Sequence, residues 1–248
     1  MTAELAPRVV TARDFLMGSI WEGTGDELHT NRLMARKSMF RQRILSGVSG
    51  MLLAIDAYRP ELIWAPLTRL RWSFDRPLFE GTRLGVRGHS AGEEHTLSGT
   101  ADGQIITHGS VVTGPPADLP RKPGRPSAGR TMTEADARLF RTWLPGDPTR
   151  DQDLPGHIPW PLIVLTASGL ITRGRHMGSF RTVLNRAFTW TFGAPLALEE
   201  TVHCELGTVE RRPSATLPGM DVVRFEAGVM STASGDQVAG VEWVMICQ

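Results

Sequence analysis

The chain has few cysteines. Its 248 residues include only two cysteines, Cys204 and Cys247, and neither belongs to a CxxC pair or to a Cys/His ligand pattern. This spacing argues against a metal site, and we expect neither a metal nor another cofactor. Each cysteine stands in a strand-like apolar run, which predicts two buried free thiols.

The chain also lacks a charge excess and a long apolar run. With 27 Lys and Arg against 26 Asp and Glu, the formal net charge is +1, whereas proteins held to nucleic acids by phosphate contacts usually carry a basic excess. The longest apolar run, 158–171, contains two prolines and is too short to span a bilayer. Residues 1–10 lack the apolar core of a signal peptide. We therefore expect a soluble cytoplasmic protein with no nucleic-acid or membrane partner.

An internal repeat is the main feature of the sequence. The length allows one large domain or two of about 120 residues each. Three landmarks occur twice in the same order: Thr11 to Asp14 and Thr133 to Asp136, Gly25-Asp26 and Gly146-Asp147, Phe74 to Pro77 and Phe192 to Pro195. Between the copies, residues 114–130 are rich in proline, glycine and charge, which is typical of a linker. We predict one unit at 1–113, a linker at 114–130 and a second unit at 131–248.

Each unit shows a change of hydrophobic period. Over 38–58 the apolar residues recur at steps of three and four, which predicts a buried helix, with Gly47 near its entry because glycine is costly inside a helix. From Leu67 the period becomes two, and Asp102-Gly103 marks a hairpin. The second unit repeats this pattern with an apolar segment at 158–171. One helix followed by an antiparallel meander predicts an α+β arrangement with a helix packed on a curved sheet.

The order of these landmarks resembles the MaoC-like hydratases and dehydratases of the hotdog fold. The residues that carry the resemblance are Thr11, Asp14, Gly25, Asp26, His29, Arg43, Ile44, Gly47, Phe74, Pro77 and Gly81. The resemblance covers nearly the whole chain. It implies a double hotdog, in which two tandem units each wrap a long central helix in an antiparallel β-sheet. It also implies a 3-hydroxyacyl or enoyl thioester substrate, carried by coenzyme A or an acyl carrier protein, and the removal or addition of water.

The resemblance makes Asp26 and His29 the catalytic pair. A carboxylate and an imidazole within reach of one water can act as an acid–base pair. The backbone amides around Ser46, Gly47 and Val48 would stand at the positive end of a helix, where they could hold a developing enolate charge. These residues are the predicted oxyanion site.

Two departures from the family pattern concern these positions. The pattern Gly-Asp-x-Asn-Pro-x-His separates the Asp and the His by five positions, but His29 follows Asp26 by three and the Asn-Pro is absent. In the second unit no histidine follows Asp147 at the family position, and Trp160 precedes a proline where the entry glycine would stand. We expect this unit to be inactive, with Asp147, His157 and Trp160 shaping the acyl pocket.

Other polar residues have less specific interpretations. A basic cluster could dock coenzyme A phosphates or an acidic carrier protein, or could be a solvated face; it consists of Arg36, Lys37, Arg41 and Arg43. The histidines in predicted strands are expected at the surface or at sheet edges: His89, His95, His108 and His203.

Three functions remain open from the sequence. The first is an acyl-thioester dehydratase or hydratase of fatty acid or polyketide metabolism. The second is a diverged hotdog thioesterase, or a cyclase or isomerase of polyketide or other secondary-metabolite biosynthesis. The third is a non-catalytic binding subunit. In each case the two units form an internal pseudo-dimer, which could pair further as a homodimer. The fold alone does not choose among these functions.

Overall fold

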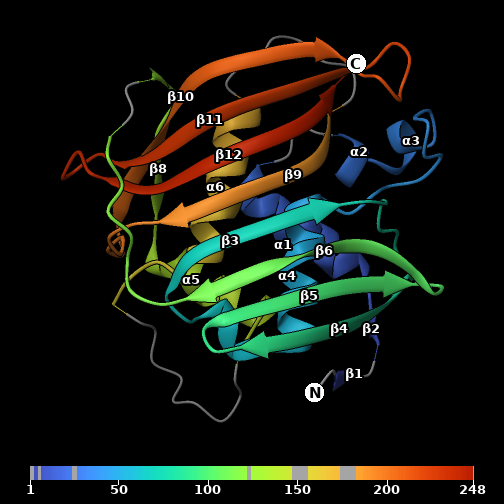
Figure 1. Cartoon of the computed structure of the whole chain (residues 1–248), viewed down its shortest axis with the longest axis horizontal. Helices are drawn as coiled ribbons and strands as arrows, with labels where there is room; N and C mark the ends of the chain where they lie inside the picture. Colours follow the sequence, from blue (N-terminus) through green and yellow to red (C-terminus); the bar gives the residue numbers. More distant parts are fainter. Residues whose placement is uncertain are drawn as a thin grey trace.

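The structure is a computed structural model that describes residues 3–4, 7–23, 27–121, 124–146, 156–173 and 183–247 (Figure 1). The first unit contains β1 (Ala3–Glu4), β2 (Arg8–Val9), α1 (Ala12–Glu22), α2 (Glu27–Thr30), α3 (Arg32–Ala35), α4 (Gly47–Tyr58), a 3-10 helix η1 (Pro60–Ile63), β3 (Leu67–Phe74), β4 (Arg83–Ala91), β5 (Glu94–Ala101) and β6 (Gln104–Thr113). The rest contains β7 (Arg125–Pro126), β8 (Arg130–Met132), α5 (Glu134–Trp143), α6 (Trp160–Arg173), β9 (Val183–Phe192), β10 (Glu200–Pro213), β11 (Asp221–Ser231) and β12 (Gln237–Cys247).

The strands of both units form one continuous antiparallel sheet. Its twelve strands, counted over the described residues, run β1-β4-β5-β6-β3-β9-β12-β11-β10-β7, with β2 beside β4 and β8 beside β10. The units meet edge to edge where β3 pairs with β9, from Arg69 opposite Thr191 to Ser73 opposite Ala187. Helices α4 and α6 lie side by side behind this sheet (Figure 1). The predicted α+β double hotdog is therefore confirmed.

The first helix of each unit begins at a capping box. Asp14 accepts a hydrogen bond from the Thr11 backbone amide at 2.7 Å, and Asp136 accepts one from the Thr133 amide at 2.9 Å. This reciprocal use of side chain and backbone satisfies amides that a helix start otherwise leaves without partners. The repeated Thr-x-x-Asp motif therefore builds the same helix start twice.

The central helix of the first unit occupies only the C-terminal part of the apolar segment 38–58. It begins at Gly47 and not at Ser38, and Ser46 is its cap, with Oγ accepting from the Ser49 amide at 3.1 Å. Ile44 and Leu45 are buried because they pair with the segment after β3: Ile44 forms a bridge with Phe79. Their apolar character thus fits a buried extended segment as well as a helix. The expectation that Gly47 lies at the helix entry is confirmed.

A pseudo-twofold relation between the units is visible in their first helices. Trp21 donates its indole N–H to Asp136 at 2.9 Å, and Trp143 donates its own to Asp14 at 2.8 Å. The two indole rings stack on each other, with centroids 6.4 Å apart. Such reciprocal contacts are the mark of an isologous interface, here formed within one chain. The internal pseudo-dimer is therefore held together by a tryptophan of each unit that hydrogen-bonds an aspartate of the other unit.

The structure corrects one expectation about the histidines and confirms the one about the cysteines. His95 is buried, and its Nδ1 lies 2.8 Å from Ser90 Oγ; burial, followed by the charge of Arg59, lowers its pKa. Cys204 and Cys247 are buried free thiols, and burial raises the pKa of Cys204 to about 12. In the described part of the chain no helix is long and apolar enough to cross a membrane.

Candidate functional site

A cavity of about 240 Å³ opens at the N-terminus of α4. Its walls come from both units: the segment before α4, the end of β3 and the start of β6 in the first, and β9, β12 and the β10–β11 connection in the second. The lining is mainly apolar, from Phe40, Ile44, Leu45, Phe74, Leu78, Ile106, Leu184, Leu217 and Ile246. Such a cavity, with a few polar groups on its wall, is the usual form of a small-molecule site.

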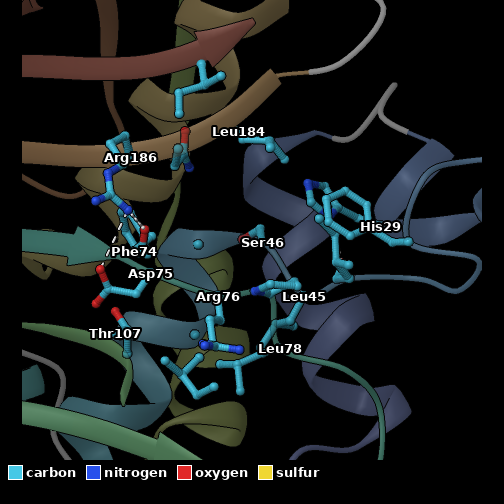
Figure 2. A pocket seen from close by; sticks show the side chains of 18 of the residues that line it. His29, Leu45, Ser46, Phe74, Asp75, Arg76, Leu78, Thr107, Leu184 and Arg186 are labelled. Atoms are coloured by element: carbon cyan, nitrogen blue, oxygen red, sulfur yellow. Dashed lines mark hydrogen bonds and ion pairs between the residues drawn. The ribbon is translucent and has the colours of Figure 1, made fainter. Parts of the chain in front are cut away.

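His29 lies on the wall of this cavity. It belongs to α2, and its Nδ1 is 2.7 Å from the carbonyl oxygen of Ile44. Because a carbonyl oxygen only accepts, Nδ1 carries the proton, and the neutral ring has its lone pair on Nε2. In Figure 2, His29 and Arg186 stand at opposite sides of the cavity, with Ser46 between them. The bond to Ile44 therefore fixes both the orientation of the ring and the tautomer that a general base needs.

The first turn of α4 faces the same cavity. Ser46 and Gly47 are lining residues, and Val48 is buried behind them. Ser46 is held from two sides, because its hydroxyl donates to Glu22 at 2.8 Å while it caps the Ser49 amide. Among the described residues the backbone amides of Gly47 and Val48 have no hydrogen-bond acceptor. These amides, at the positive end of a buried helix, are suited to hold an oxygen that carries negative charge.

Charged residues lie at the rim of the cavity on the side opposite His29. Arg186 lies 3.6 Å from Asp75 and donates to the Phe74 carbonyl at 3.2 Å (Figure 2). Asp75 also contacts His108 Nδ1 at 2.8 Å. These contacts tie the end of β3 in the first unit to β9 in the second. No three His, Cys, Asp or Glu side chains come close enough to hold a metal ion, as far as the described residues extend.

The equivalent position in the second unit is filled. Ile158 donates its amide to Leu196 just as Leu45 does to Leu78, so Trp160 stands where Gly47 stands in the first unit. Its indole packs on Phe192 with ring centroids 5.9 Å apart and donates to the Leu62 carbonyl. The next residue is a proline and has no amide to offer. The helix entry of the second unit therefore lacks the open space found at α4 and lacks the donor that the Val48 amide provides there.

The other predicted site residues lie in different surroundings. His157 is half-buried and does not line the cavity. It occupies the position equivalent to Ile44 and forms an isolated β-bridge with Ala197. Arg36, Lys37 and Arg41 are exposed near the cavity. Arg43 is only 10% exposed, because Glu80 binds it at 2.5 Å and it stacks on Phe15. Asp26 and Asp147 lie outside the described residues.

Two features of the site were not predicted from the sequence. Asn185 and Arg186 reach the cavity from β9 of the second unit. Phe74 was a landmark of the resemblance only, but its ring lies 3.0 Å from where a Cβ on Gly47 would be. A bulky residue at position 47 would therefore collide with the cavity wall, which accounts for the glycine at this helix entry.

Comparisons with known proteins support the fold. No protein-family model and no curated protein matches the sequence. A putative MaoC domain dehydratase from Chloroflexus aurantiacus superposes with a TM-score of 0.72 at 12% identity, over 100% of this chain and 94% of that one. A conserved hypothetical protein from Mycobacterium tuberculosis, described as having a double hotdog fold, superposes with a TM-score of 0.70 at 13% sequence identity. The match covers 100% of this chain and 96% of that one. A putative oleoyl thioesterase from Lactobacillus plantarum superposes with a TM-score of 0.57 at 9% sequence identity. The match covers 99% of this chain and 97% of that one.

At these identities a structural likeness shows the fold, and the chemistry has to be argued from the site itself. The whole length of the chain superposes on such proteins as two tandem units. The chain has the double hotdog fold of the MaoC-like proteins.

Proposed function

We propose that the protein is an acyl-thioester dehydratase or hydratase that acts on a 3-hydroxyacyl or enoyl thioester. The observation that carries this proposal is the position of His29, on the wall of a largely apolar cavity that Ser46 and Gly47 at the start of α4 also line. A base and an oxyanion site that face one cavity satisfy the geometric requirements for proton abstraction next to a thioester carbonyl.

In the hydration direction the steps are as follows. His29 Nε2 takes a proton from a water molecule while the water oxygen bonds to C3 of the enoyl group. The electron pair of the C2–C3 double bond moves toward the thioester, and the carbonyl oxygen becomes an enolate oxygen. The amides of Gly47 and Val48 hold this oxygen, and C2 then takes the proton from His29 Nε2, which restores the neutral imidazole. Dehydration is the reverse sequence. A donor is most effective where charge develops in the transition state.

Asp26 is proposed as the carboxylate partner of His29. Negative charge near an imidazole favours its protonated form, which is the form that His29 takes after it removes a proton from water. The proposal for Asp26 rests on its sequence position, since residues 24–26 lie outside the described residues.

The acyl chain is proposed to lie along the apolar wall that both units build. Leu184, Leu217 and Ile246 from the second unit complete this wall, and Trp160 closes the second unit's own helix entry. Asp147 is retained as a residue that shapes the acyl pocket, whereas His157 does not line this cavity. The second unit would thus contribute shape, while the first contributes the base.

The carrier is proposed to dock on the segment between α3 and α4. Arg36, Lys37 and Arg41 are exposed there, and the apolar side chains of Leu33 and Met39 are 69% and 70% exposed. Positive charge suits the phosphates of coenzyme A or the acidic surface of an acyl carrier protein. Arg43, which binds Glu80, would support the base of this surface.

The test is a turnover assay with the full-length protein and enoyl-CoA thioesters of increasing acyl length, repeated with the acyl groups on a carrier protein. The proposal predicts loss of the ultraviolet absorbance of the conjugated enoyl thioester, without release of free thiol, at a kcat of roughly 1–10³ s⁻¹ for the preferred chain. Thiol release without hydration would favour the thioesterase alternative, which the likeness to the Lactobacillus plantarum protein keeps open. No turnover of any thioester would contradict both.

A further inference from the structure

A β-bulge turns one polar side chain of the second unit toward α4. In the β9–β12 pair, Val244 lies opposite Ala187 and Met245 opposite Asn185, so Arg186 is an extra residue on β9. Phe188 is buried on the inner face, and strict alternation from it would put Arg186 inside and Asn185 outside. The bulge shifts this alternation. Arg186 is exposed, and Asn185 lies inside, against the start of α4.

Asn185 packs directly on the helix entry. Its Nδ2 lies 3.2 Å from the place where a Cβ on Gly47 would be. The side chain is partly buried and lines the cavity that His29 lines. No hydrogen bond joins it to any described residue, and the side chain is partly exposed to the cavity.

Three donors without an acceptor among the described residues therefore lie at the start of α4. They are the backbone amides of Gly47 and Val48 and the side-chain amide of Asn185. Gly47 and Asn185 are partly exposed on the wall of the cavity, where an oxygen of a bound ligand can replace water as the acceptor. The ligand of the cavity is the natural source of this oxygen, since the described part of the chain offers none at this place.

We propose that Asn185, which belongs to the otherwise inactive second unit, is a catalytic residue. Its Nδ2 hydrogen-bonds the thioester carbonyl oxygen together with the α4 amides. This proposal rests on the proposed function and goes beyond it. The second unit then supplies part of the oxyanion site as well as the acyl wall. Its donor reaches across the β3–β9 junction to the helix of the first unit.

The bond strengthens as the reaction proceeds. When water adds to C3, the π electrons of the double bond pass to the thioester, and the oxygen next to Nδ2 changes from a neutral carbonyl to an enolate. Hydrogen bonds to a charged oxygen are roughly twice as strong as those to a neutral one. Asn185 would therefore act mainly on the transition state, and its loss should lower kcat more than it raises KM.

The experiment compares Asn185→Ala and Asn185→Asp with the wild type in full-length protein, on the enoyl thioester that the wild type prefers. We expect kcat to fall about 10²-fold or more in Asn185→Ala with KM within a few-fold, as for other oxyanion donors. Asn185→Asp keeps the shape of the side chain but places a carboxylate beside the enolate, so its kcat should be as low or lower. Thr189→Ala, on the outer face of the same strand, is the matched control and should keep wild-type kinetics.

Three readouts separate the possible failures. Wild-type kcat and KM in both Asn185 variants would overturn the proposal for this residue while leaving the proposed function standing. A loss of kcat with a lowered melting temperature in both variants would mean that Asn185 acts on folding, and would also overturn it. Absence of turnover in the wild type would refute the proposed function itself. Binding of an unreactive saturated acyl-CoA should change by less than tenfold in Asn185→Ala, because that ligand develops no enolate charge.

Discussion

Replacing His29 with glutamine should lower kcat/KM for hydration of the preferred enoyl thioester by about 10²- to 10⁴-fold. Glutamine can keep a hydrogen bond to the Ile44 carbonyl, which His29 Nδ1 makes at 2.7 Å, but it has no group that takes a proton near neutral pH. The loss should therefore appear in kcat with the fold intact. The measurement is steady-state kinetics with a thermal unfolding curve for each variant.

His89→Gln is the control for this substitution. His89 is exposed on β4 and does not line the cavity, so the same chemical change there should leave kcat/KM within about twofold of wild type, as expected for surface substitutions with little effect on stability. Equal activity of His29→Gln and the wild type would remove His29 from the mechanism.

Replacing Asp136 with alanine should lower the free energy of unfolding by about 3 kcal/mol at pH 7, because it removes a helix cap and leaves a buried indole without its acceptor. Asp136 accepts from the Thr133 amide at 2.9 Å and from Trp21 at 2.9 Å, and it pairs with Arg130 at 3.4 Å. Trp21 is 1% exposed, so the substitution removes the carboxylate acceptor of a buried indole N–H. Chemical denaturation at fixed pH measures the difference.

The same pair of proteins should show a defined pH dependence. Burial raises the pKa of Asp136, but the hydrogen bonds from Thr133 and Trp21 and the charge of Arg130 outweigh it, and the net pKa lies below the ordinary value. A carboxyl group with a lowered folded-state pKa stabilises the protein above its unfolded pKa, about 3.9, and this stabilisation is lost as the pH falls through the folded pKa. The difference between wild type and Asp136→Ala should therefore be constant from pH 5 to pH 7, as both values are above about 3.9, and should shrink under more acidic conditions.

Glu134→Ala on the same helix is the matched control. Glu134 is exposed and pairs with Arg138 one turn away, and such surface pairs contribute about 0.5 kcal/mol or less. If Asp136→Ala cost no more than Glu134→Ala, the exchange of tryptophan–aspartate bonds between the units would not stabilise the pseudo-dimer.

The parts of the fold that depend on local signals could be predicted from the sequence. The Thr11 and Thr133 capping boxes, the Asp102-Gly103 turn and the alternating strands each depend on residues close together in the chain. The apolar segment 38–58 is helical only from Gly47 onward, because Ile44 and Leu45 are buried by pairing with a distant segment. A buried extended segment and a buried helix have similar apolar content.

The site could be predicted only in its first-unit part. Ser46 and Gly47 were found because the helix entry follows a family order of residues, and His29 because it follows a Gly-Asp pair. Asn185 carries no comparable signal. It reaches the cavity through a bulge in β9 and through pairing between units far apart in sequence. His95 was misplaced for a similar reason, since its ring hydrogen-bonds Ser90 on the neighbouring strand β4, which in turn hydrogen-bonds Tyr58 at the end of α4.

The most direct test of the account is to incubate the wild type with its preferred enoyl thioester in ¹⁸O-labelled water and to locate the label by mass spectrometry. Acid–base hydration at His29 predicts one ¹⁸O atom on C3 of an intact 3-hydroxyacyl thioester, and His29→Gln should form this product far more slowly. Label in the carboxylate of a free acid, or an unlabelled and unchanged thioester with every acyl length and carrier tested, would contradict it.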